Sequence, residues 1–143
     1  MDNFLPDLDS EKRNRIINAA IEEFASFPFD KASTNNIVKE AGISKGLLFH
    51  YFDNKKALYE KLAAFVIHKL YYMIVDRIDW NQTDLFERLR QLALIKLEVN
   101  RTYPAMFDFV FKLMAGKKAC KLQEMIGIYK DYGLDFSRLY ADI

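Results

Sequence analysis

The chain has 143 residues, which is long enough for one domain with a hydrophobic core, or for a small module joined to a larger helical one. Hydrophobic residues make up 51% of it and charged residues 29%, a balance that excludes a largely unfolded chain. The formal net charge is only +1, so no overall excess of positive charge indicates a nucleic-acid partner. Such a partner can be inferred only from a local arrangement of side chains.

Few residues are available for metal binding, and no segment has the features of an export signal. One cysteine, Cys120, cannot form an internal disulfide, and with only His50 and His68 there is no ligand set at zinc spacing. The acidic start, residues 1–7, lacks the basic region and apolar run of a secretion signal. The most apolar window, residues 63–75, is shorter than the ~20 residues of a membrane helix. We therefore expect a cytoplasmic protein with no metal, no cofactor and no membrane segment.

Three helices are predicted in the first part of the chain. Asp9-Ser10-Glu11 offers a cap for a first helix, which carries apolar residues on one face and runs from about Ser10 to Phe27, before Pro28. The hydroxyls of Ser33-Thr34 can cap a short second helix, which Gly42 ends as a residue suited to a left-handed turn. Ser44 is a candidate cap for a third helix that runs to about Phe52.

Four further helices are predicted in the rest of the chain. Asp53-Asn54 breaks the third helix and caps a fourth, whose apolar stripe from 58 to 74 is long enough to connect two modules. A fifth helix is capped by Thr83 or Asp84, and a sixth, from Ala105 to about Met114, is apolar nearly all round and therefore expected to be buried on most sides. A seventh spans about 120–132. No strand alternation is visible, so the sequence predicts an all-α protein.

The second and third helices have the spacing of a helix-turn-helix. In this motif the first two helices form a platform that holds the next helix clear of the protein body, and small residues at the turn let the helices approach. Ala41-Gly42-Ile43-Ser44 fits such a turn, and residues 44–52 form the short helix that would enter the major groove of duplex DNA.

On these residues the chain resembles the TetR family of transcriptional regulators. The resemblance covers roughly the first 60 residues and is carried by Ala20, Phe24, Thr34, Ile37, residues 41–46, residues 49–52, Lys55 and Leu58. It implies a helix-turn-helix DNA-binding domain over residues 1–55 and a helical regulatory domain over residues 56–143, used for ligand binding and dimerisation. Family members usually continue for several dozen residues beyond this length, so the resemblance also implies a regulatory domain that is incomplete at its C-terminus.

The resemblance further implies which residues meet DNA. Thr34, Tyr51 and Lys55 would contact phosphate, because a hydroxyl can donate to phosphate oxygen and a lysine neutralises its charge. The remaining candidates lie at the start of the third helix and along it, where glycine permits close approach and leucine can pack on a thymine methyl group. They are Ser44, Lys45, Gly46, Leu47 and His50.

Two features depart from the family pattern. Phe27-Pro28-Phe29 replaces the glycine-containing turn that is common after the first helix, and Phe49 stands where tyrosine is frequent. Because Phe49 and Phe52 are three residues apart on one helix, at least one must pack into the core, and Phe52 is the better candidate. His68 is interpreted as a structural histidine rather than a ligand.

Aromatic residues in the second half of the chain could line a pocket for an effector, although core packing would explain most of them. The candidates for ligand contact are Tyr72, Tyr103, Phe107 and Phe111. The resulting hypothesis is a ligand-responsive repressor that binds a palindromic operator as a homodimer and responds to a small-molecule effector. The alternative is a helical binding or scaffold protein that keeps the fold without binding an operator. Enzymatic activity is not expected, because no nucleophile with a nearby base and no phosphate-binding loop is present.

Overall fold

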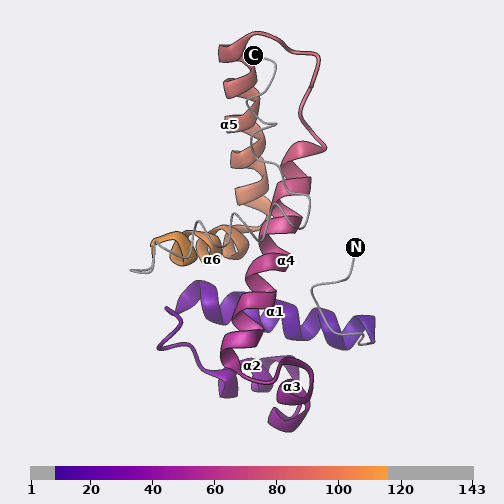
Figure 1. Cartoon of the computed structure of the whole chain (residues 1–143), viewed down its shortest axis with the longest axis vertical. Coiled ribbons are helices and arrows are strands. Elements are labelled where there is room, and N and C mark those ends of the chain that lie inside the picture. The colour runs from indigo at the N-terminus through magenta and orange to yellow at the C-terminus, as the bar shows by residue number, and fades with distance from the viewer. Residues whose placement is uncertain (1–8, 116–143) are drawn as a thin grey trace.

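The computed structural model describes residues 9–115, and over this range it contains six α-helices and no strand. Three of them form an N-terminal head: α1 (Ser10–Ser26), α2 (Thr34–Ala41) and α3 (Lys45–Phe52). The others are α4 (Lys55–Val75), α5 (Leu85–Thr102) and α6 (Pro104–Ala115). Figure 1 shows α4 rising from the head, with α5 returning beside it and α6 crossing above α1.

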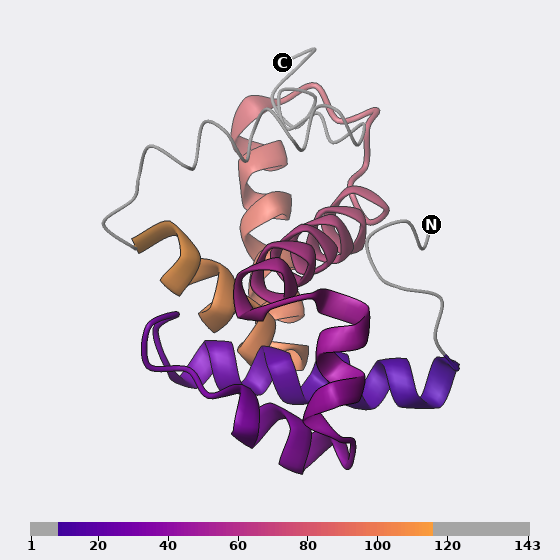
Figure 2. The same ribbon diagram turned by 60° about the horizontal axis from the view of Figure 1, so that its bottom comes forward.

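In the head, α2 and α3 lie on one side of α1 and α6 lies on the other (Figure 2). The core between them contains the apolar face of α1, with Ile16 and Phe24 each 1% exposed, together with Ile37 of α2 and Leu48 and Phe52 of α3. Because α1 contacts both α2 and α6, it forms the layer between the helix-turn-helix and the rest of the molecule.

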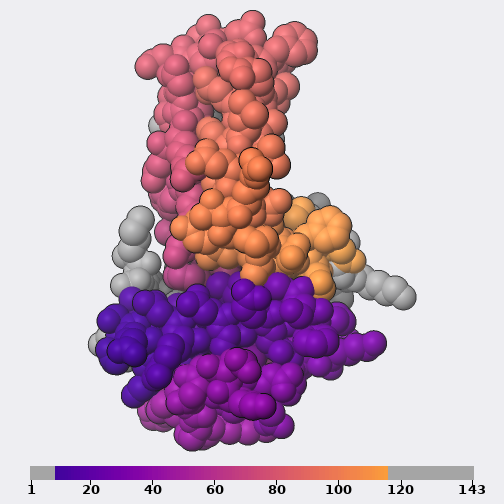
Figure 3. Space-filling model, turned by 180° about the vertical axis from the view of Figure 1, so that it is seen from behind, coloured from indigo at the N-terminus to yellow at the C-terminus, as the bar shows by residue number. Residues whose placement is uncertain are grey.

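Helix α4 connects the head to the upper part of the molecule, as its length predicts. Leu58 and Leu62 belong to the same core cluster as α1, and so does Phe109 of α6, so one continuous core runs from the head into the body. Tyr71 and Val75 at the far end of α4 form a second, smaller cluster with residues of the following loop and of α5. Figure 3 shows the head as a broad base beneath the narrow column of α4 and α5.

The ends of the helices follow local signals in the sequence. Phe27 is extended, as the residue before Pro28 must be, so α1 ends at Ser26, one residue earlier than predicted. Asp84, rather than Thr83, caps α5 by accepting a hydrogen bond from the Glu87 N–H at 2.8 Å. Asp9 occupies the N-cap position of α1, as predicted, and its carbonyl accepts from the Arg13 N–H at 2.9 Å, but its side chain makes no capping hydrogen bond to any described residue.

Helix α6 differs from its prediction in two ways. It begins at Pro104 rather than Ala105, because proline suits the first position of a helix, where its missing N–H would have no partner. Of its side chains only Met106 and Phe109 are buried against the described part of the chain, whereas Phe111 is 73% and Met114 54% exposed there. The predicted seventh helix, residues 120–132, and Cys120 lie outside the described residues. None of the helices from α1 to α6 is long and apolar enough to cross a membrane.

Candidate nucleic-acid interface

The turn between α2 and α3 is built around one glycine. Gly42 has φ +65° and ψ +40°, in the left-handed region that side chains rarely adopt, which confirms its predicted role. Its N–H donates to the Lys39 carbonyl at 3.2 Å, and the Ile43 N–H donates to the Val38 carbonyl at 3.0 Å, closing the end of α2. Ser44 then caps α3, since its Oγ accepts from the Leu47 N–H at 3.1 Å. The chain therefore passes from α2 to α3 through three residues.

Helix α3 has one buried face and one exposed face. Leu48 and Phe52 are 0% and 1% exposed and anchor α3 in the core, which confirms the predicted role of Phe52. Phe49 is half-buried, and the Lys45 ammonium lies 5.9 Å from its ring centroid. The candidate DNA-contacting residues lie away from the anchors: Ser44, Lys45, Gly46 and His50 are exposed, and Leu47 and Tyr51 are half-buried.

Gly46 has no packing reason to be glycine. A Cβ built at this position would meet no described atom within 4 Å, apart from its own helix and chain neighbours, and the backbone has no positive φ. A glycine inside a helix costs roughly 0.5–1 kcal/mol relative to alanine. Packing within the described part of the chain therefore does not require this glycine.

The three helices at this end of the molecule share an electrostatic feature. None of α2, α3 and α4 has an acidic residue in its first turn; α6 also lacks one, whereas α1 and α5 each carry one. The N-terminal N–H groups of a helix carry partial positive charge, which acidic side chains would offset. Thr34 and Lys55, two predicted phosphate contacts, are the first residues of α2 and α4, and both are half-buried.

A buried carboxylate, not recognised from the sequence, fixes the position of α2. Glu23 of α1 is 9% exposed and accepts hydrogen bonds from the Ser33 N–H at 2.7 Å and from Asn36 Nδ2 at 3.3 Å. The signal in the sequence was its spacing, because Glu23 lies seven residues after Ile16, on the face of α1 that carries the buried apolar residues. Such a residue must have partners in the folded protein.

The four aromatic candidates for ligand contact are spread over three elements. Tyr72 of α4 packs against the second, smaller cluster at the far end of α4. Its ring centroid lies 4.7 Å from that of His68, whose pKa is lowered by burial. Tyr103 ends α5 and is 40% exposed, while Phe107 of α6 packs against the main core and Phe111 is exposed. A hollow of about 410 Å³ between α1 and α2 contains none of the four. Their ligand role stays a prediction.

Two short helices joined at a left-handed glycine, with one face of the second exposed, define a helix-turn-helix head on a helical body. Residues 16–62 match the family model described as bacterial regulatory proteins, tetR family. The head formed by these residues is that of the TetR family of transcriptional regulators. Both the resemblance and the all-α fold with an N-terminal helix-turn-helix are thus confirmed.

Individual relatives agree with this assignment. The chain is 30% identical over 110 residues to the HTH-type transcriptional regulator RutR of Escherichia coli, a match covering 75% of this chain and 50% of RutR. It is 41% identical over 59 residues to the uncharacterized regulator YvdT of Bacillus subtilis, covering 41% of this chain and 30% of YvdT. A TetR family regulator from Chloroflexus aurantiacus superposes with a TM-score of 0.70 at 30% identity, covering 78% of this chain and 51% of that one. The chain thus spans about half the length of RutR and of this structural relative.

Proposed function

We propose that this chain regulates transcription by binding duplex DNA through α3. The observation that carries the proposal is the division of α3 into two faces: Leu48 and Phe52 hold it in the core, and Lys45, Gly46 and His50 lie exposed along its outer side. A helix held in this way can enter the major groove without disturbing the core, as the second helix of a helix-turn-helix does.

The charge at this surface supports phosphate binding. Lys45 and Lys55 begin α3 and α4, so each adds a positive charge at a helix N-terminus that has no acidic residue in its first turn. Phosphate contacts of this kind fix the register of the protein on DNA, and base contacts from Leu47 and His50 would then give sequence preference. The net charge of +1 is consistent with such local recognition.

We further propose that the protein acts in the cytoplasm as a ligand-responsive repressor. Two copies would place their heads about 34–36 Å apart on a palindromic operator. A small-molecule effector bound in the helical body would favour one spacing of the heads over the other, because a ligand shifts a conformational equilibrium only by binding its states unequally. The continuous core that joins α1, α4 and α6 supports such coupling.

The test is selection of duplexes from a random pool by the 143-residue chain, followed by affinity measurements over a salt series. Lys45→Ala should weaken binding and lower the salt slope by about 1, and Tyr51→Phe should weaken it through loss of one hydroxyl contact. Lys112→Ala is the matched control, because Lys112 is an exposed lysine on α6.

The outcomes separate the candidate functions. Enrichment of a palindrome, with both head variants weakened and Lys112→Ala unchanged, would support an operator-binding dimer. Enrichment of a single half-site would support DNA binding by one head at a time. If the folded chain enriches no duplex even at low salt, the DNA-binding proposal is wrong, and the alternative of a helical binding or scaffold protein takes its place.

A further inference from the structure

The loop between α1 and α2 carries an aromatic side chain at the point where the chain departs from the family pattern. Phe29 is half-buried, and its ring centroid lies 5.0 Å from that of Tyr59 of α4 and 6.5 Å from that of Phe24 of α1. Phe109 of α6 completes the group, 5.9 Å from Phe24 and 5.3 Å from Tyr59. These four residues, which we call the junction cluster, join the loop to three helices.

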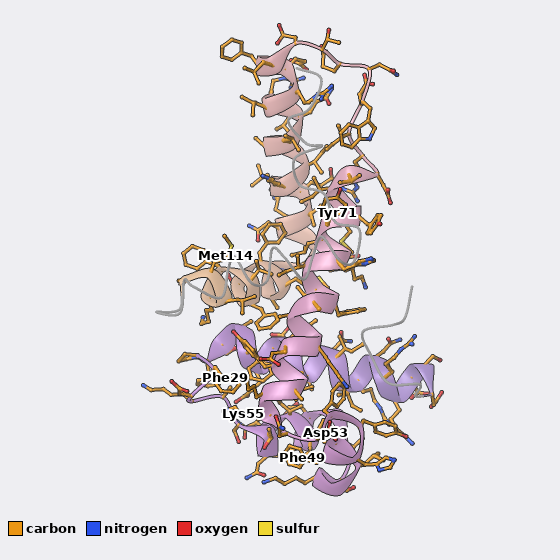
Figure 4. The ribbon with its side chains drawn as sticks, viewed as in Figure 1. Phe29, Phe49, Asp53, Lys55, Tyr71 and Met114 are labelled. Carbon is orange, nitrogen blue, oxygen red and sulfur yellow. The ribbon has the colours of Figure 1, made fainter. Side chains whose placement is uncertain are left out.

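The Phe29 ring also meets a charge. The Lys55 ammonium lies 4.7 Å from the ring centroid, well inside the range in which a cation is attracted to an aromatic face (Figure 4). In the described part of the chain, the other lysine–phenylalanine pairs of this kind are longer, at 5.7 to 5.9 Å, and lie on one helix or on adjacent ones. The pair of Phe29 and Lys55 instead connects segments 26 residues apart.

The place of Lys55 makes this contact relevant to DNA binding. Lys55 is the first residue of α4, and the Asn54 side chain caps that helix by accepting from the Ala57 N–H at 2.9 Å. A lysine side chain has four rotatable bonds, so holding it in one place before binding reduces the entropy lost when it meets a phosphate. A ring that itself packs against two others, those of Phe24 and Tyr59, can hold it in this way.

We propose that Phe29 is a positioning residue for Lys55, holding its ammonium at the N-terminus of α4, where the DNA backbone would be bound. The inference rests on the proposed DNA binding and adds a residue that makes no DNA contact of its own. Phe109 contributes from α6, so the same cluster ties the position of the body to that of the lysine.

The experiment is a double-mutant cycle in the full chain, with Phe29→Leu, Lys55→Met and the double variant, measured on the selected duplex. Lys55→Met should lower the salt slope by about 1, as expected when one phosphate contact is lost. Phe29→Leu should weaken binding about two- to five-fold when Lys55 is present and should have no further effect in the Lys55→Met background. Phe29→Tyr, which keeps the aromatic face, should bind DNA with the affinity of the wild type.

Two controls separate positioning from a general effect on the fold. Phe27→Leu changes a 44% exposed ring of the same loop and should bind DNA like the wild type. In the DNA-free chain, the NMR signals of the Lys55 side-chain methylene protons should be shifted upfield by the Phe29 ring and should lose this shift in Phe29→Leu.

The results separate the positioning role of Phe29 from the proposed DNA binding itself. If Phe29→Leu weakens binding equally with and without Lys55, or not at all, Phe29 is only a core residue and the inference is wrong. If the wild type shows the upfield shift but binds no duplex, the ring contact exists and the proposed function itself fails, and the positioning role fails with it.

Discussion

The Glu23 carboxylate of α1 accepts a hydrogen bond of 2.7 Å from the backbone N–H of Ser33, the residue that caps α2. The same carboxylate accepts from Asn36 Nδ2, in the first turn of α2. One buried side chain therefore sets where α2 begins and how it lies on α1. Because α3 follows α2 after a three-residue turn, this contact also supports the orientation of the proposed DNA-binding helix.

Removing this carboxylate should destabilise the head. Glu23→Ala leaves the Ser33 N–H and the Asn36 side-chain amide without their partner in a part-buried position, at a cost of about 1–3 kcal/mol in the free energy of unfolding. Urea denaturation would measure this change. Glu22→Ala is the control. Glu22 is the neighbour of Glu23 in sequence but is exposed, so its replacement should have little effect on stability. Equal stability of the two variants would show that the hydrogen bonds contribute nothing net.

The contacts that sequence analysis predicted and those it missed differ in their span along the chain. Ser33, Ser44 and Asn54 cap helices by accepting from an N–H three residues later, so each capping signal lies within one helical turn. The bond from Ser33 to Glu23 spans 10 residues, and the contact from Lys55 to Phe29 spans 26. Such partners are set by how the helices pack, and this packing cannot be predicted from local patterns in a single sequence.

The same reason applies to α6. Its composition predicted burial on most sides, but burial depends on which elements surround the helix, and within residues 9–115 the neighbours α1, α4 and α5 bury Met106 and Phe109 and leave Phe111 and Met114 exposed. On α5, similarly, Leu92 and Val99 are buried whereas Leu97 is 55% exposed. Periodicity identified these helices correctly but could not determine how many neighbours each one has.

The junction between α3 and α4 contains a residue in a strained backbone conformation, and a substitution can relieve this strain. Asp53 has φ +57° and ψ −56°, and the Asn54 N–H donates to the Phe52 carbonyl at 2.6 Å, which makes a γ-turn centred on Asp53. A non-glycine residue in such a conformation costs on the order of 1–3 kcal/mol, more than the roughly 0.5–1 kcal/mol of extra chain entropy that glycine loses. Asp53→Gly should therefore raise the free energy of unfolding by about 1 kcal/mol.

A matched variant distinguishes relief of strain from removal of charge. Asp53→Ala also removes the carboxylate but keeps a Cβ in the same conformation, so its midpoint of urea denaturation should not rise. On DNA, both variants should bind more tightly at low salt, because each removes a negative charge two residues before Lys55. A gain in stability for Asp53→Ala equal to that for Asp53→Gly would contradict the strain argument.

Arg88 holds the loop between α4 and α5. It is 1% exposed, its Nε donates to the Gln82 carbonyl at 3.0 Å, and Nη2 donates to the carbonyls of Gln82 and Trp80. Arg88→Leu would leave these acceptors without the guanidinium, and hydrogen bonds to charged groups contribute about 1.5–3 kcal/mol each. We expect a loss of this order in the free energy of unfolding, measured by urea denaturation at pH 7.

Arg90→Leu is the control for Arg88→Leu. Arg90 is exposed and pairs with Glu87 three residues earlier on the surface of α5, and such surface ion pairs contribute little. Its replacement should leave stability nearly unchanged. If both variants lose stability equally, the effect of Arg88 would come from the helix propensity or surface charge of α5 rather than from the loop.

Tyr59 of the junction cluster should make the stability of the protein sensitive to alkaline pH. Burial raises the pKa of its phenol above the ordinary value of 10.0, because the charged phenolate is poorly solvated there. Below pH 10 both the folded and the unfolded forms hold the proton, so Tyr59 adds no pH dependence. As the pH rises from 10 towards the higher pKa of the folded protein, the unfolded chain releases the proton first, and stability falls.

The measurement is the free energy of unfolding from urea denaturation at pH 8, 9, 10 and 11, in wild type and in Tyr59→Phe. The variant keeps the ring that contacts Phe24, Phe29 and Phe109 but cannot ionise, so its stability should decline less above pH 10. Ionisation of lysines affects both proteins alike and cancels in the difference. Parallel curves through pH 11 would mean that the phenol is solvated as in the unfolded chain, and that the junction cluster is open to water on the side of Tyr59.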